Sequence, residues 1–334
     1  MIMKNNIFVK DYQSILDVHN TQVAIKLVKD NFEKKLAAKL GLIRVTAPLF
    51  VEPSTGLNDE LSGVEKAVNF KSFQSNTNLE IVQSLAKWKR HALHKYNCSG
   101  LYTDMNAIRP FEELDNIHSL YVDQWDWEKV VTEDERTLDY LKEIVSLIYE
   151  ALRETAELVY KNYPQIKHNL PHEITFVSSD ALEKMYPNLS RKERENAITK
   201  LHKAVFLTNI GHPLEDGMPH DSRASDYDDW NLNGDLLLWF DTLGIALEVS
   251  SMGIRVNKDS LIKQLEYKGE QYKLNFDYHK NVINDVLPLT IGGGIGQSRM
   301  CMFMLKKAHI GEVQVSYWED EDIIKFKEIG IELL

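Results

Sequence analysis

The sequence predicts an α+β fold, with a mostly antiparallel sheet flanked by helices, in a single domain covering residues 1–334. Three observations carry this prediction. Strand-length apolar runs cluster after Ala204 and around the polar loop that follows Arg109. Helical patterns lie between these runs at irregular intervals, so the strict β-α-β alternation of parallel sheets is missing. No linker rich in Pro, Gly or Ser divides the sequence, and no internal repeat is visible.

Helices are predicted where apolar residues recur at helical spacing and where capping residues mark the ends. The first pattern covers residues 21–40 and is followed by Gly41, a plausible C-cap. Ser190 and Glu193 form a capping box, which opens a helix that runs to residue 202. The remaining helical patterns cover residues 84–96, 137–161 and 297–307.

Strands are predicted from short apolar or alternating runs bounded by polar residues and glycines. The first covers residues 42–51 and contains Pro48, which belongs at a sheet edge or at an interface. Residues 292–296 are interpreted as a glycine-rich turn before an apolar helix. The other predicted strands cover residues 101–103, 120–127, 204–209, 235–240 and 246–249.

Composition narrows the class of protein. The 334 residues are 43% hydrophobic and 27% charged, as in ordinary globular proteins. The two cysteines, Cys98 and Cys301, form no CxxC pair and suggest no disulfide framework, so a reducing, cytoplasmic location fits best. The N-terminus has no apolar signal segment, and no apolar run reaches the ~18 residues of a membrane span, so no membrane association is expected.

The net charge of −11 disfavours a large nucleic-acid interface, because proteins that track phosphates usually carry a basic surface. No nucleic-acid partner is therefore expected. The negative charge does not exclude a small anionic substrate, since a few arginines in one pocket can bind ATP whatever the overall charge. The sequence contains neither the GxSxG nor the HExxH motif and shows no convincing metal-binding cluster.

Residues 291–299 form the most informative segment, Ile-Gly-Gly-Gly-Ile-Gly-Gln-Ser-Arg. Glycines let a backbone approach a ligand closely, and a helix N-terminus favours anions. The segment is neither a P-loop, which needs a following Gly-Lys-Ser/Thr, nor a Rossmann fingerprint. A tight turn before a core helix is the plain alternative. Arg299 favours ligand binding, because an arginine early in an otherwise apolar helix needs an anionic partner or an aromatic face.

A second candidate combines Arg109 with the strand that follows its polar loop. Period-two alternation places Gln124, Asp126 and Glu128 on one face of this strand, opposite two tryptophans. These polar groups could form a solvated face. As a pocket wall, they would supply acceptors for an ammonium group and a side-chain amide. The nearby Arg109 favours the pocket wall.

Four further segments carry polar residues, and each has a plain interpretation that involves no ligand. Glu248 follows an apolar strand and could form an ion pair with Arg255, seven residues later. Asp59 lies in a loop, where aspartate usually serves turn chemistry. Residues 84–90 place cations on a helix whose default is a solvated face. Residues 221–230 form an acidic stretch that could be disordered, but its aromatic residues argue for order.

Taken in order, these elements resemble the three signature motifs of the class II aminoacyl-tRNA synthetase catalytic domain. Residues 41–48, with the helix before them, resemble the first motif, which forms the dimer interface in that family. Residues 109–128 resemble the second motif, and residues 292–299 resemble the third. The resemblance implies the antiparallel α+β fold of that catalytic domain and a homodimer.

Within that fold, the spacings Ser84–Lys89 and Glu248–Arg255 resemble those of the aspartate and asparagine enzymes. The sequence is more similar still to the ammonia-dependent asparagine synthetases, or aspartate–ammonia ligases, from residue 10 or so to the C-terminus. One departure is the stretch between Trp230 and Asn233, which is short for that family. The phrases that carry the likeness are Leu61–Val68, Ser84–Arg90, Val122–Glu128, Asp226–Trp230, Ser250–Arg255 and Thr290–Arg299.

The resemblance implies ATP-dependent synthesis of L-asparagine from L-aspartate and ammonia. The β-carboxylate would attack the α-phosphorus of MgATP, giving β-aspartyl-AMP and pyrophosphate, and ammonia would then release AMP. A tRNA-charging paralogue of the aspartyl or asparaginyl type is the alternative. The charge of −11, and the expectation that no separate anticodon-binding domain precedes residue 10, oppose it. A non-catalytic sensor on the same fold is opposed by both signature arginines and by Glu248.

The resemblance also implies roles for individual residues. Arg109 would hold the α-phosphate and the attacking carboxylate oxygen, and Arg299 would hold ATP. Glu248, with Asp235 as a second candidate, would bind Mg²⁺ together with the phosphates. The remaining implied contacts are Ser84, Lys89, Asp126, Asp228, Ser250, Ser251 and Arg255 for aspartate, and Glu248, Gly292 and Gly294 for the nucleotide.

Two hypotheses follow from the chemistry. An aspartyl-tRNA synthetase activates the α-carboxylate of aspartate, whereas this reaction activates the other end of the molecule. Lys89 or Arg255 is therefore expected to hold the α-carboxylate, with Asp126 facing the α-ammonium group. Ammonium is not a nucleophile, so a general base is required. By resemblance, Asp59 is that base, and Gln124 orients the incoming nitrogen.

Overall fold

The computed structural model describes residues 6–61 and 66–334. Residues 62–65, part of the segment Leu61–Val68 that carries the family likeness, lie outside the described residues. Over this part of the chain, eight strands form one large sheet in the order β1-β5-β6-β11-β10-β9-β8-β7. Their bounds are β1 Ile43–Arg44, β5 Gly100–Ile108, β6 Tyr121–Val130, β7 Thr175–Ser178, β8 Ala204–Thr208, β9 Asp228–Phe240, β10 Ile245–Arg255 and β11 Thr290–Gly296.

The large sheet is antiparallel through its six central strands. Each neighbouring pair from β5 to β8 runs antiparallel, and only the outer pairs β1–β5 and β7–β8 are parallel. The predicted α+β class with a mostly antiparallel sheet is therefore confirmed. Both edge strands are short, since β1 has two residues and β7 has four.

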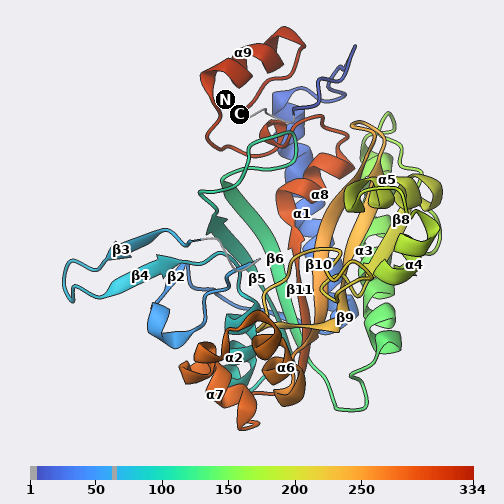
Figure 1. Ribbon diagram of the computed structural model, residues 1–334. Coiled ribbons are helices and arrows are strands. Elements are labelled where there is room, and N and C mark those ends of the chain that lie inside the picture. Colours follow the sequence, from blue (N-terminus) through green and yellow to red (C-terminus); the bar gives the residue numbers. More distant parts are fainter. Residues whose placement is uncertain (1–5, 62–65) are drawn as a thin grey trace.

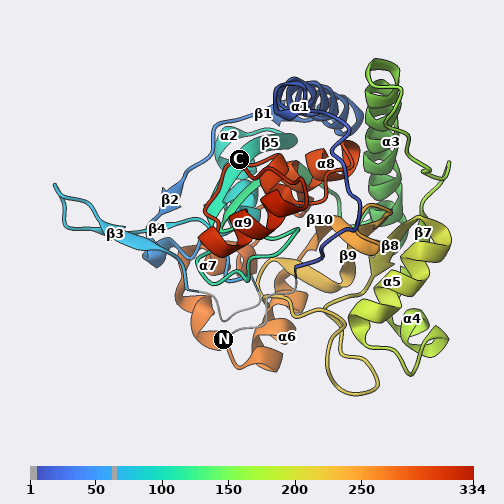
Figure 2. The ribbon, with the colours of Figure 1, turned by 90° about the horizontal axis from the view of Figure 1, so that it is seen from above.

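Two long helices, α1 (Val18–Leu40) and α3 (Leu138–Asn162), cover one face of this sheet (Figures 1 and 2). The capping residues set their ends, because the Asp17 side chain accepts a hydrogen bond at the start of α1 and Gly41 closes it in a left-handed conformation. Trp125 of β6 packs on Phe32 of α1, with ring centroids 4.9 Å apart. Both tryptophans of β6 are fully buried on this side, so the alternating residues of β6 face the other side.

Shorter helices surround the sheet, and all seven lie within the described residues. The predicted capping box of Ser190 and Glu193 is confirmed at the start of α5. In Figure 1, α2, α6 and α7 gather at one end of the sheet, α4 and α5 lie beside β8, and α9 lies at the opposite end. Their bounds are α2 Ala86–Tyr96, α4 Ser179–Met185, α5 Arg191–His202, α6 Lys258–Lys268, α7 Asp277–Ile283, α8 Gln297–Met304 and α9 Asp320–Glu328.

The strand predicted over residues 42–51 is wrong as a single element. The chain pairs only at β1 and at β2 (Phe50–Val51), on two different sheets. Pro48 lies between them and has no N–H to donate, which explains the break. β2 joins β4 (Asn78–Ile81) and β3 (Asn69–Lys71) in a small sheet, and its β3–β4 hairpin projects from the body in Figure 1.

The glycine-rich turn predicted at residues 292–296 is also wrong. These residues lie in β11, a central strand that pairs with β6 on one side and β10 on the other. Gly292, Gly294 and Gly296 lie opposite Glu128, Asp126 and Gln124. The glycines leave the space that these polar side chains need above the sheet.

Among the described helices, none is long and apolar enough to cross a membrane.

Candidate active site

A cavity of about 340 Å³ opens on the face of the large sheet opposite α1 and α3. Its wall comes from α2, the loop after β5, the loop before β9, and strands β6, β10 and β11. Of the site residues predicted from the sequence, Asp59, Asp235 and Gly292 are buried outside the lining. The predicted residues that line the cavity are Ser84, Lys89, Arg109, Gln124, Asp126, Asp228, Glu248, Ser250, Ser251, Gly294, Arg255 and Arg299.

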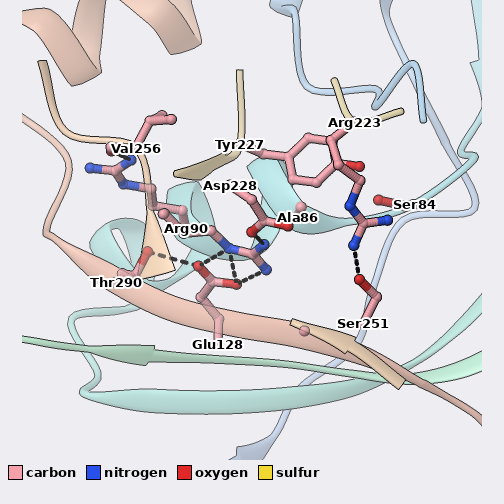
Figure 3. A network of polar contacts seen from close by, with 12 residues as sticks. Ser84, Ala86, Arg90, Glu128, Arg223, Tyr227, Asp228, Ser251, Val256 and Thr290 are labelled. Carbon is pink, nitrogen blue, oxygen red and sulfur yellow. Dashed lines mark hydrogen bonds and ion pairs between the residues drawn. The ribbon is translucent and has the colours of Figure 1, made fainter. Parts of the chain in front are cut away.

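Arg255, at the end of β10, is the centre of a buried ion network on the cavity floor. Its Nε lies 2.9 Å from Oε1 of Glu128 and its Nη2 lies 2.8 Å from Oε2, a bidentate pair. Nη1 donates to Asp228, and Thr290 donates to Glu128 at 2.7 Å. Figure 3 shows Thr290, Glu128 and Asp228 joined in this network. The ring of Tyr227 lies 6.0 Å from the guanidinium.

The network fixes the charges of its members. Burial favours the neutral form of Arg255, but the two carboxylates outweigh it and raise its pKa well above the usual value. Burial also opposes ionisation of Glu128, yet Arg255 lowers the pKa of that carboxyl. The ion pair considered between Glu248 and Arg255 is not formed. Arg255 pairs with Glu128 instead, because β11 brings β6 and β10 together.

Lys89 reaches the same floor from α2 and is fully buried. Its ammonium group lies 2.5 Å from Oδ1 of Asp126 and 3.0 Å from the carbonyl oxygen of Gly293. Oδ2 of Asp126 has no hydrogen-bond partner among the described residues. The solvated helix face considered for residues 84–90 is therefore wrong, because Lys89 points into the protein. A cation and a carboxylate with one free oxygen stand side by side on the floor.

The glycines of β11 make this crowding possible. A Cβ built on Gly292 would overlap the carboxylate of Glu128, and one on Gly294 would overlap the amide of Gln124. On Gly293 it would lie 2.5 Å from Cβ of Met252. Any larger residue would displace these neighbouring side chains. Gly292 therefore shapes the site from beneath without lining it.

Arg109 and Arg299 face the other end of the cavity. Arg109 donates to the backbone carbonyl of Gln83 at 3.3 Å, while its buried Nε has no partner among the described residues. Burial, and secondarily the charge of Arg299, lower the pKa of Arg109. Arg299 donates to the carbonyls of Ile117 and Glu248, both at 3.2 Å. Two guanidinium groups that repel each other across one pocket are suited to an anion.

Glu248 and Asp235 lie on neighbouring strands at the same end. The Glu248 carboxylate lies 3.8 Å from Nη1 of Arg299. Burial opposes its ionisation, but Arg299 and other cations lower its pKa. Asp235 lies 3.3 Å from Nη2 of Arg223, and burial, assisted by the charge of Glu248, raises its pKa. No cluster of three or more metal-binding side chains occurs in the described part of the chain.

Asp59 lies behind the cavity rather than in its wall and is fully buried. Its Oδ2 accepts hydrogen bonds from the Ser84 hydroxyl and, at 2.8 Å, from the backbone N–H of Ala86 at the start of α2. Burial raises the pKa of this carboxyl. Ser84, which does line the cavity, separates Asp59 from it. Ala86, the second donor to Asp59, also lines the cavity, so Asp59 supports this part of the cavity wall from behind.

The main residue that sequence reasoning missed is Arg223. It lies in the acidic stretch 221–230, lines the cavity and points toward Ser251 in Figure 3. This stretch is ordered, as its aromatic residues indicated, since Tyr227 and Trp230 are buried. The available signal was a single arginine among carboxylates beside buried aromatics, a setting that places a cation in a closed site.

Solved structures define the class of this fold. The chain is similar to asparaginyl-tRNA synthetase from Pyrococcus horikoshii complexed with asparaginyl-adenylate, with a TM-score of 0.67 and 18% identity, over 88% of this chain and 68% of that one. It is also similar to the Entamoeba histolytica enzyme, with a TM-score of 0.66 and 14% identity, over 90% and 68%. The fold is that of a class II aminoacyl-tRNA synthetase catalytic domain.

The family follows from the sequence comparisons. Residues 19–330 match the aspartate–ammonia ligase family. The chain is 56% identical to an aspartate–ammonia ligase of Bacillus cytotoxicus over 313 residues, which are 93% of this chain and 96% of that protein. It is equally similar, at 56% over the same shares, to one from Bacillus mycoides. The chain belongs to the aspartate–ammonia ligase family.

The function predicted from the sequence is confirmed at this level. The chain is a ligase of asparagine biosynthesis, and its reaction is the ATP-dependent synthesis of L-asparagine from L-aspartate and ammonia. The alternative of a tRNA-charging paralogue is not favoured, because the synthetases share the fold at low identity whereas the ligases share more than half of the residues.

Proposed function

We propose that the cavity binds ATP and aspartate together and forms β-aspartyl-AMP before ammonia attacks. The observation that carries this proposal is the pairing of two cationic ends in one cavity. Arg109 and Arg299 stand at one end, and Lys89 and Arg255 stand at the other. The first pair suits phosphates and the second suits a carboxylate. An adenylate formed between them makes the leaving group AMP, which departs far more readily than oxide.

The aspartate end has a polarity that matches the substrate. Arg255 and Lys89 hold the α-carboxylate, and the free Oδ2 of Asp126 accepts from the α-ammonium group. Ser250 and Ser251 line the wall between the two ends, and Asp228 holds Arg255 from behind. Because the α-groups are anchored on the floor, the β-carboxylate extends toward the nucleotide. This arrangement selects the β-carboxylate for activation.

The nucleotide end supplies fixed cations for the transferring group. Arg109 contacts the α-phosphate and the attacking carboxylate oxygen, where negative charge accumulates as the new bond forms. Among the described residues, its guanidinium donates only to the Gln83 carbonyl, so its other N–H groups remain for this contact. Arg299 binds ATP from the start of α8, and Gly294 lets the nucleotide lie close to β11. Glu248, on β10, also contacts the nucleotide.

A divalent metal fits this end, and we propose that it is Mg²⁺. Glu248 and Asp235 would hold it, because a carboxylate pair beside a phosphate site is the set that Mg²⁺ prefers. Burial, assisted by the charge of Glu248, raises the pKa of Asp235 beside Arg223, whereas Arg299 and other cations lower the pKa of Glu248. When bound, the metal neutralises phosphate charge.

The ammonia step needs a base and an orienting group. Gln124 lines the cavity next to Asp126 on the face of β6, where its amide oxygen can accept an N–H of ammonium. Asp59 accepts the proton through Ser84, whose hydroxyl already donates to it. Burial raises the pKa of Asp59, which makes it a better base when it is charged.

An oxygen-transfer experiment tests the central step. Aspartate labelled with ¹⁸O in the β-carboxyl group is incubated with ATP and ammonium, and the AMP is analysed by mass spectrometry. One labelled oxygen should appear in AMP, since the β-carboxylate oxygen stays on phosphorus. Aspartate labelled only in the α-carboxyl group is the control and should give unlabelled AMP. Unlabelled AMP from both substrates would exclude the β-adenylate.

We also propose that the chain forms a homodimer in the cytoplasm. Large apolar side chains are exposed on one region formed by α1, β1 and the segment after it, including Val23 (52% exposed), Ile43 (53%) and Leu49 (50%). Sedimentation equilibrium should give twice the monomer mass. Ile43→Asp should shift the enzyme toward monomer, while Leu201→Asp, at an exposed site on α5, should not.

A further inference from the structure

A connected set of buried charged groups lies behind Asp59, away from the cavity. Lys87 of α2, Asp226 before β9 and His279 of α7 are each at most 3% exposed. Lys273, in the 3-10 turn Gln271–Asn275, is equally buried. None of the four lines the cavity. None is used in the binding and adenylation steps proposed above.

Lys87 stands between two carboxylates at unequal distances. Its Nζ lies 2.9 Å from Oδ2 of Asp226 and 3.8 Å from Oδ1 of Asp59. The Asp59 Oδ1 atom has no hydrogen-bond partner among the described residues. Oδ2 of Asp226 also lies 2.9 Å from Nε2 of His279 and 4.0 Å from Nζ of Lys273. Lys87 is thus bound to Asp226 and only faces Asp59.

This arrangement is costly unless it serves the reaction. Buried charges lose their hydration, and ion pairs seldom stabilise a fold more than apolar residues of the same size would. Lys87 makes its hydrogen bond to Asp226 and lies 3.8 Å from Oδ1 of Asp59, beyond hydrogen-bond distance. Here the contact is left open, and the carboxylate keeps one oxygen free. The Lys87 cation therefore acts on Asp59 through its charge, without a hydrogen bond to the carboxylate.

We propose that Lys87, held in place by Asp226, is a positioning residue for the ammonia step that keeps Asp59 in the charged form able to take a proton from ammonium. This inference rests on the proposed role of Asp59. In the step, an N–H bond of ammonium breaks and its electron pair stays on nitrogen. The Ser84 oxygen takes the proton while its own hydroxyl proton passes to Oδ2 of Asp59.

The surrounding charges set the direction of each effect. The groups that face Asp59 are Lys87 and Ser84 from the α2 side, and Asp226 and Tyr227 from the segment before β9. Burial raises the pKa of Asp59, the charge of Lys87 lowers it, and the charge of Asp226 raises it. His279 and Lys273 contact Asp226 rather than Asp59. Loss of Lys87 and loss of Asp226 therefore act on Asp59 in opposite directions.

Two substitutions test this opposition. The pH profile of asparagine formation is measured for Lys87→Met and Asp226→Asn, as a ratio to the unsubstituted enzyme at each pH, so that the free ammonia concentration cancels. Below the pKa of Asp59 the base is protonated and the rate falls. Lys87→Met should move this acid limb to higher pH by about one unit, and Asp226→Asn should move it to lower pH, since a charge at this range shifts a carboxyl by ~1–3 units.

Matched measurements separate this effect from a folding defect. Aspartate-dependent ATP–pyrophosphate exchange reports adenylation alone and should stay within about twofold in both variants. Lys307→Met removes a lysine that is equally buried but outside the cavity, and its acid limb should not move. Limbs that do not move, or that move in the same direction for Lys87→Met and Asp226→Asn, would overturn the proposal. Equal loss of exchange and synthesis in Lys87→Met would also overturn it.

Asp59→Asn, measured in parallel, distinguishes the two levels of the account. If this variant loses exchange and synthesis equally, the proposed role of Asp59 is wrong and the inference about Lys87 is wrong with it. If it loses synthesis alone while the limbs of the other variants fail to move, only the inference about Lys87 is wrong. In the double variant Asp59→Asn/Lys87→Met, the profile should equal that of Asp59→Asn, because Lys87 acts through Asp59.

Discussion

The guanidinium of Arg255 forms a bidentate pair with the carboxylate of Glu128, with Nε–Oε1 and Nη2–Oε2 distances of 2.9 and 2.8 Å, and both residues are almost fully buried. The pair joins β10 to β6 across the glycines of β11. It leaves the Arg255 side chain in the cavity lining, with its position fixed before substrate arrives. A preformed cation is the feature that a site for the α-carboxylate of aspartate requires.

Arg255→Lys should raise the KM for aspartate about tenfold or more, because a lysine cannot keep both bonds to Glu128 and still reach the substrate, and one charge-assisted hydrogen bond contributes ~1.5–3 kcal/mol. Steady-state kinetics checks this. Arg90→Lys is the control, since Arg90 is as buried but, within the described part of the chain, donates only to the backbone carbonyls of Pro288 and Val256. An unchanged KM in Arg255→Lys would exclude Arg255 from aspartate binding.

Arg109→Ala should slow ATP–pyrophosphate exchange by ~10²–10³-fold, the usual effect of removing one donor to a charge that develops in the transition state. The structural reason is that the Arg109 guanidinium lines the cavity and, among the described residues, donates only to the Gln83 carbonyl. Arg153→Ala removes an arginine from α3, on the far face of the sheet, and should leave the exchange rate unchanged. A loss of less than threefold in Arg109→Ala would show that the α-phosphate is held elsewhere.

The glycines of β11 should differ in their tolerance of a methyl group. Gly292→Ala overlaps the Glu128 carboxylate and should lower the free energy of unfolding by ~1–3 kcal/mol, as overpacking usually does. Gly296→Ala meets three side-chain carbons of Arg299, the nearest at 3.4 Å, which are ordinary contacts, and should change the free energy of unfolding little. Urea denaturation of both variants checks this. Equal free energies for the two would contradict the crowding seen across β11.

Acid should destabilise the fold through a buried histidine. His309 is 1% exposed, and burial lowers its pKa to about 4 from 6.5. The unfolded chain therefore binds a proton that the folded chain refuses, so the free energy of unfolding falls as pH drops from 6.5 toward 4. His309→Gln should remove on the order of 3 kcal/mol of this pH dependence.

Urea denaturation of His309→Gln at two pH values measures the effect. His172→Gln is the control, because the His172 side chain is 85% exposed and should leave the pH dependence intact. If His309→Gln and the unsubstituted protein lose the same free energy on acidification, another group is responsible.

Local patterns predicted much of the fold. The alternation in β6 placed Gln124, Asp126 and Glu128 on one face, and the structure confirms it, because side-chain direction in a strand depends only on neighbouring residues. The cap of α1 and the capping box of α5 were equally local and are confirmed. The eight-stranded order was beyond such patterns, since it depends on which distant strands pair.

The errors in the site have the same origin. Glycines signal turns locally, but in β11 they leave space for the side chains of Glu128 and Gln124 on the neighbouring strand. The choice of Glu128 over Glu248 as the partner of Arg255 depends on the register of three strands. Arg223 was overlooked because its place in the site depends on its hydrogen bond to Asp235, which lies 12 residues away on β9. Pairings of this kind appear only when the sheet is assembled.

The measurement that bears most directly on the account compares two half-reactions in Asp59→Asn. Asparagine formation from aspartate, ATP and ammonium is measured beside aspartate-dependent ATP–pyrophosphate exchange. Because Asp59 lies behind Ser84 and outside the cavity wall, exchange should stay within about threefold of the unsubstituted enzyme, while asparagine formation should fall by ~10²–10⁴-fold, the usual contribution of a general base. Equal loss of both activities would contradict the claim that Asp59 serves the ammonia step.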